Sequence, residues 1–280
     1  MKKTTAIILF IGLAISALLF QLPKGNVSNK STNSVAGGAN RDAATNEAAP
    51  KESESSHATP LTAEQQKQIA GLKVNLQQAK TEAQQVSALE KLAAAFIGAD
   101  KYDSAAYYAA DYADQHPNLP HVLRAGQLYF EAQTYAINAQ KGQKMGEKAR
   151  MYFEKALSID PNNLLVKTNL AMTYVDTPTP MKGISLLREV IEQEPTFVLA
   201  IFNLGILAIK SNQFGKGQER FTQILKLEPT NYKAALNLGF CLAQLDKKEE
   251  AKKILKRVLN ESKDAEETKA AKELLAEMQH

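Results

Sequence analysis

The chain has 280 residues, a net charge of +4, one cysteine and no tryptophan. Acidic and basic residues are interspersed, whereas binding to nucleic acid needs a concentrated basic stripe, so we predict no nucleic-acid partner. A single cysteine excludes an intramolecular disulfide and a thiol cluster for zinc or iron–sulfur. The four histidines do not fall at ligand spacing either, so we expect no metal and no cofactor. Helix-forming residues dominate from Pro60 onward, which predicts an all-α protein with almost no strand.

The first segment, residues 1–23, has the composition of a membrane anchor or a signal sequence. Lys2 and Lys3 precede the apolar run Ala6–Phe20, and the uncharged stretch approaches the ~20 residues that span a bilayer as a helix. The best cleavage site, around Ser16, lies inside the apolar run, which favours a retained anchor over a cleaved signal peptide. A retained anchor predicts a single-pass cell-membrane protein whose remainder faces the periplasm or exterior; cleavage would release it into the periplasm.

Residues 24–60 differ from everything that follows them. They are rich in Asn, Ser, Ala, Gly and Thr and contain almost no large apolar side chain after Val35. Such a segment cannot bury enough surface to fold, so we predict a disordered linker between the anchor and a folded domain of residues 61–280.

A period of 34 residues organises the folded domain. Asp160-Pro161, Glu194-Pro195 and Glu228-Pro229 are spaced by it, and so are three Asn-Leu-Gly/Ala triplets that begin at Asn169, Asn203 and Asn237. A proline ends a helix because it cannot donate the next hydrogen bond, and Gly or Ala lets two helices approach closely. These residues therefore predict a repeated helix pair.

The period and its motif positions together resemble the tetratricopeptide repeat (TPR). The resemblance implies a right-handed superhelical solenoid of about five helix pairs, with a leading helix over residues 61–84 and a capping helix over 264–279. The halves of the second repeat stand about eleven residues too far apart, so 133–145 is an insertion, for which we expect longer helices rather than a larger loop. The predicted repeats are 86–117, 120–161, 164–195, 198–229 and 232–263.

The same resemblance places a binding groove on the first helix of each pair. There Asn169, Asn203 and Asn237 form a ladder of amides that can pair with the backbone of an extended peptide, although asparagine is also the common family choice at this position. In the two earlier repeats the position falls on Lys91 and Arg124, a basic end or an ordinary surface. The surrounding residues either bind apolar side chains or pack within a tight superhelix: Met172, Phe202, Ile206 and Phe240, together with Thr168, Leu199, Ile209 and Leu236.

No nucleophile–base pair, shifted carboxylate pair or metal constellation stands out in the sequence, so an enzyme is the weaker hypothesis. We predict a non-enzymatic protein–protein interaction scaffold of the bacterial cell envelope, an adaptor or assembly factor with a peptide or protein partner. A self-associating structural protein, which would form a homo-oligomer, is the alternative.

Overall fold

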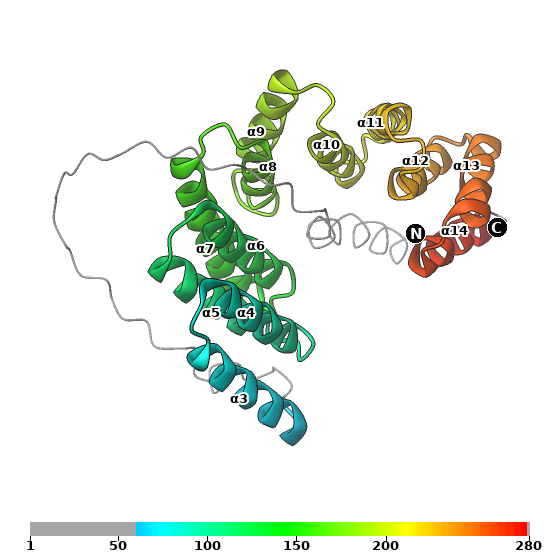
Figure 1. Ribbon diagram of the computed structural model, residues 1–280. Coiled ribbons are helices and arrows are strands. Elements are labelled where there is room, and N and C mark those ends of the chain that lie inside the picture. The colour runs from blue at the N-terminus through cyan, green and yellow to red at the C-terminus, as the bar shows by residue number, and fades with distance from the viewer. Residues whose placement is uncertain (1–59, 279–280) are drawn as a thin grey trace.

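The computed structural model describes residues 60–278, where the chain forms α-helices and no strand. The predicted anchor and nearly all of the predicted linker lie outside these residues. Among the helices described, none combines the length and the apolar composition needed to cross a bilayer. Labelled as in Figure 1, the helices are α3 (Ala63–Gln78), α4 (Glu82–Ile97), α5 (Tyr102–Gln115), α6 (Leu119–Thr134), α7 (Ala139–Ile159), α8 (Leu164–Met172), α9 (Pro180–Gln193), α10 (Val198–Lys210), α11 (Phe214–Leu227), α12 (Tyr232–Gln244), α13 (Lys248–Glu261) and α14 (Ala265–Glu277).

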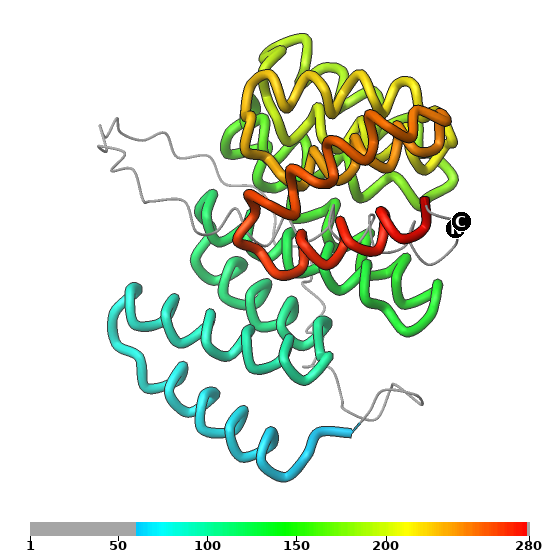
Figure 2. The backbone as a smooth tube through the Cα atoms, turned by 90° about the vertical axis from the view of Figure 1, so that its right-hand side faces the viewer, coloured from blue at the N-terminus to red at the C-terminus, as the bar shows by residue number. Residues whose placement is uncertain are grey.

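The helices form five consecutive pairs, from α4/α5 to α12/α13, along a curved path with α3 at one end and α14 at the other (Figure 1). Each helix packs mainly on its neighbours in sequence, and Figure 2 shows α3 lying beside α4 along its length. The predicted solenoid of five pairs, with a leading helix and a terminal helix, is confirmed. Packing between neighbours alone makes this an extended fold rather than one built around a central core.

Local side-chain chemistry explains where many of the helices begin. Thr62 and Thr81 each accept a hydrogen bond from the residue three positions on, and the glutamine there bonds back to the threonine N–H, which completes a capping box. These bonds satisfy N–H groups that the first turn of a helix leaves unpaired. Side-chain caps of the simpler kind come from Asn118, Asn138, Asn163, Asn231 and Asp264.

In three of the five pairs, the two helices are joined by the same kind of turn. Asp100, Asn212 and Asp246 adopt left-handed backbone with φ of 56°, 56° and 61°. The next N–H then reaches back five residues, as from Gln213 to the carbonyl of Ala208 at 2.8 Å. The pairs α6/α7 and α8/α9 contain no described residue with positive φ, so their turns are built differently.

The small residue of the first helix packs against a large one of the second, as the repeat pattern predicts. A Cβ added at Gly205 would stand 2.6 Å from the ring of Phe221, and one at Gly126 would stand 2.7 Å from the ring of Phe153. No real Cβ approaches a ring so closely. The glycine therefore sets the distance between the two helices, and both phenylalanines are fully buried.

The buried core is divided along the solenoid into an N-terminal cluster, a C-terminal cluster and a small cluster between them. The N-terminal cluster spans α3 to α8, and the C-terminal cluster spans α10 to α14. The middle cluster, which we call the joint, consists of the four buried residues Ala171, Leu187, Val190 and Ala200. Its residues come from α8, α9 and α10, and α8 is only 9 residues long.

The insertion in the second repeat mainly lengthens its second helix. Helix α7 has 21 residues, whereas α9, α11 and α13 have 14 each. Longer helices were expected, but the break at 135–138 was not, since no glycine or proline marks it. Asn138 explains the break, because its side chain accepts a hydrogen bond from the N–H of Lys141 and caps α7.

Candidate functional site

The three ladder asparagines lie in register on the first helices α8, α10 and α12. All three are buried, with solvent-exposed fractions of 7% for Asn169, 8% for Asn203 and 0% for Asn237. The Asn237 Nδ2 donates to the Lys233 carbonyl at 2.9 Å, while its Oδ1, also buried, accepts no hydrogen bond. The three asparagines therefore occupy equivalent positions on successive first helices, as predicted, and the Oδ1 of Asn237 is an unpaired acceptor.

The apolar residues predicted around the ladder belong to the core in this conformation. Phe202, Ile206 and Phe240 are buried members of the C-terminal cluster. The Phe202 ring meets the Phe221 ring edge-on at a centroid distance of 5.4 Å. Their burial corresponds to the second sequence hypothesis, packing within a tight superhelix, rather than to an open apolar groove. Met172 remains only partly buried, beside the joint.

Arg124 is engaged by carboxylates of its own chain. Its Nε and Nη2 donate to Oε1 and Oε2 of Glu90 at 2.9 and 2.7 Å, which is the bidentate geometry of a strong ion pair. Burial raises the pKa of nearby Glu131. The positive charge of Arg124 acts to lower this pKa, and the negative charge of Glu90 acts to raise it further. Glu90 therefore neutralises the charge of Arg124, and Lys91 is the other residue of the predicted basic end.

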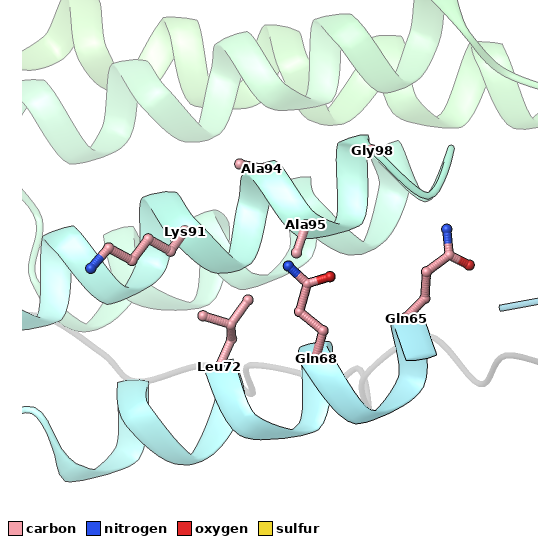
Figure 3. Close-up of a pocket in the computed structure, with 7 residues that line it drawn as sticks. All are labelled: Gln65, Gln68, Leu72, Lys91, Ala94, Ala95 and Gly98. Carbon is pink, nitrogen blue, oxygen red and sulfur yellow. The ribbon is translucent and has the colours of Figure 1, made fainter. Parts of the chain in front are cut away.

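Lys91 lies on the exposed surface of α4 and lines two clefts between α4 and α3, one of which is drawn in Figure 3. The clefts hold about 510 and 520 Å³, and both are lined by Leu72 and Lys91, so they adjoin. We call the two together the α3–α4 trough. The sequence identified Lys91 and the leading helix, but it did not indicate that a cleft lies between α3 and α4. The lining residues are Gln65, Gln68, Leu72, Asn75, Gln78, Ala79, Ala83, Gln84, Ser87, Ala88, Lys91, Ala94, Ala95 and Gly98.

Two observations bear on catalytic chemistry in the described part of the chain. Residues 60–278 contain no group of His, Cys, Asp or Glu that could hold a metal ion. Burial raises the pKa of the Cys241 thiol to about 12, so the thiolate that a nucleophile requires is scarce at neutral pH.

Models of the tetratricopeptide repeat match residues 208–277 and 138–163. The chain contains TPR repeats. One match spans the last regular repeats and the terminal helix, and the other lies in the elongated α7 and the turn after it. A comparison with curated proteins finds no match to the sequence.

Solved TPR structures share this arrangement of helices. A TPR protein from Parabacteroides merdae has a TM-score of 0.52 and 15% identity, covering 76% of this chain and 91% of its own. A thermophilic TPR protein from Thermus thermophilus also gives 0.52, with 14% identity, covering 62% and 89%. MamA from Desulfovibrio magneticus gives 0.44 with 17% identity, covering 61% and 92%. At such identities the first two show the fold alone, and the third supports no argument.

Proposed function

We propose that this TPR chain is a non-enzymatic protein–protein interaction scaffold of the bacterial cell envelope, an adaptor or assembly factor that binds a peptide or protein segment along α8, α10 and α12. The observation that carries the proposal is the buried, unpaired Oδ1 of Asn237 in register with Asn169 and Asn203. Leaving such an acceptor unpaired costs roughly 1–3 kcal/mol. A backbone N–H of a bound segment would supply the missing donor.

Binding along these helices requires the solenoid to open, because the ladder and the phenylalanines beside it are buried. The joint is the place where opening costs least, since only four buried residues form its core and two of them are alanines. Movement of α10–α14 relative to α3–α7 at this point would give a partner access to Met172 and the asparagines next to it.

The anchor of residues 1–23 would hold the repeats at the outer side of the cytoplasmic membrane. Lys2 and Lys3 support this orientation, because positive residues remain on the cytoplasmic side. N-terminal sequencing of the membrane-extracted protein tests the anchor. A start at Met1 is the expected result, and a start at residue 17 or later would establish cleavage instead.

The binding proposal is tested with a photo-crosslinking amino acid at position 203 of the full chain, in cells. We expect crosslinks to another protein from this position. A matched probe at Lys226, on α11, should give none to the same partner. Crosslinks to a second copy from position 203, together with a dimer by light scattering, would replace the scaffold with the self-associating alternative.

A further inference from the structure

The α3–α4 trough exists because the two helices that form it pack incompletely. Of the 16 residues of α3, only Ile69 is fully buried. The side of α4 that faces it is made of small residues, which leave space where longer side chains would meet α3. Figure 3 shows the amides of Gln65 and Gln68 directed into this space from α3. The small residues of the α4 wall are Ala83, Ser87, Ala88, Ala94, Ala95 and Gly98.

Lys91 is the single charged residue among those that line the trough. It is exposed, and no carboxylate of the described residues forms an ion pair with it. The adjacent Glu90 is occupied by Arg124, at 2.7 Å. A ligand in the trough therefore meets one uncompensated positive charge.

The remaining polar groups of the trough are neutral: the Ser87 hydroxyl and side-chain amides with unused hydrogen-bonding capacity. The Oε1 atoms of Gln65 and Gln84 accept the capping hydrogen bonds of α3 and α4, but their Nε2 atoms remain available. The side chains of Gln68, Asn75 and Gln78 make no hydrogen bond within the described residues. Side-chain amides both donate and accept, so they suit the backbone of an extended chain.

We propose that the α3–α4 trough is a second binding site, which takes an extended and otherwise uncharged peptide segment carrying one carboxylate. The carboxylate pairs with Lys91, the amides pair with the backbone, and Leu72 contacts apolar atoms at the centre. Each cleft lies within the roughly 300–1,000 Å³ of ligand sites in proteins. The site lies on α3 and α4, away from α8, α10 and α12, so it does not depend on the function proposed above.

The test uses the full chain in a mild detergent and two acetylated octapeptides of Ala, Gln and Ser. One ends in a free carboxylate and the other in a carboxamide. Titration followed by NMR of the peptides should show the free acid binding at least fivefold more tightly. Lys91→Gln should abolish this preference, while Lys67→Gln, an exposed lysine of α3 outside the trough, should preserve it. Equal affinity of the two peptides for the native chain would overturn the proposal.

A photo-crosslinker in place of Gln68 distinguishes the other occupants. A crosslink to the free-acid peptide supports the proposal, whereas a crosslink to residues 24–59 or to a second copy, not displaced by the peptide, contradicts it. An Asn203→Ala/Asn237→Ala variant should bind the octapeptide as the native chain does. Absence of any crosslinked partner at position 203 of the otherwise native chain, with retained octapeptide binding, would contradict the scaffold proposal alone.

Discussion

The N-terminal and C-terminal halves of the solenoid have the same arrangement of helix pairs but differ in the residues that form their cores. The N-terminal cluster relies on alanines and tyrosines, with stacked rings such as Tyr129 on Tyr152 at 5.6 Å. Polar contacts support it, as where Tyr152 donates to Asp114 at 2.7 Å. The C-terminal cluster consists mainly of Leu, Ile, Phe and Ala and repeats every 34 residues. The comparison shows that one helix-pair geometry can be maintained by regular aliphatic packing or by irregular aromatic and polar contacts.

The largest expected effect comes from removing the ring that packs on the glycine in each half. Phe221→Ala and Phe153→Ala should each lower the free energy of unfolding by about 3–5 kcal/mol. Phe221→Ala should cost more, because Phe202 also loses its ring partner. Urea unfolding followed by circular dichroism measures both. Leu227→Ala, at a 41% exposed residue, is the control and should change little. Equal effects of Leu227→Ala and Phe221→Ala would contradict the packing described.

The joint between the halves should be sensitive to a single methyl group. A Cβ at Gly183 would overlap the backbone carbonyl oxygen of Ala171, which cannot rotate away as a side chain can. Gly183→Ala should therefore lower the free energy of unfolding by about 1–3 kcal/mol or more. Gly215→Ala is the matched control, since nothing lies within 4 Å of its added Cβ. Equal melting temperatures of the two variants would show that the helices at the joint can move apart to accommodate the added methyl group.

The C-terminal half should lose stability at alkaline pH through Cys241. Burial raises the pKa of this thiol from 9.0 to about 12, so the folded state favours the neutral thiol. The resulting stability is fully present below pH 9 and declines as the pH rises from 9 toward 12. By pH 10 the loss should be on the order of 1 kcal/mol. Urea unfolding from pH 8 to 10 should show a shallower decline for Cys241→Ala, and identical pH slopes would disprove the contribution.

Removing one hydrogen bond from the N-terminal half should lower the free energy of unfolding only modestly. Tyr152→Phe removes the hydrogen bond to Asp114, while the ring stays buried and Asp114 keeps its ion pair with Lys155. The expected destabilisation is about 1 kcal/mol, measured by urea unfolding. Tyr174→Phe is the control, since the Tyr174 hydroxyl makes no hydrogen bond within the described residues. An equal or larger loss in the control would show that the hydrogen bond from Tyr152 to Asp114 does not support this half.

The smallest effect should be a stabilisation of the leading helix. Gly71 lies in the middle of α3 with nothing within 4 Å of an added Cβ. Gly71→Ala should raise the stability of α3 by about 0.5–1 kcal/mol, because alanine favours helix. Hydrogen exchange of the α3 amides would detect slower opening. Unchanged exchange would mean that contacts with α4, not helix propensity, limit the stability of α3.

The sequence predicted the fold well because the determinants are local. Proline, glycine and large apolar residues recur at fixed spacing, and each acts through its immediate neighbours, as Gly205 does with Phe221. The break at 135–138 escaped prediction because Asn138 caps a helix only once the chain has turned there.

The candidate site was less predictable, since it depends on which side chains meet across repeats. The spacing placed Arg124 in the groove register, but its pairing with Glu90, 34 residues earlier, requires the two helices to lie side by side. Burial of Phe202 and Phe240 likewise depends on the rings that they meet on α11, Phe221 and Phe214. The leading helix was predicted, but the cleft that it forms with α4 depends on how the two helices pack and could not be.

The left-handed turns at Asp100, Asn212 and Asp246 bear on how this chain can change in length over evolutionary time. Each is closed by a backbone hydrogen bond that reaches back five residues, so an added residue there would break the bond and shift the second helix. The α6/α7 and α8/α9 turns lack that closure among the described residues, and the inserted segment of the second repeat lies at one of them. Natural variation in repeat length should therefore accumulate in the middle of the solenoid, while its two ends keep their register.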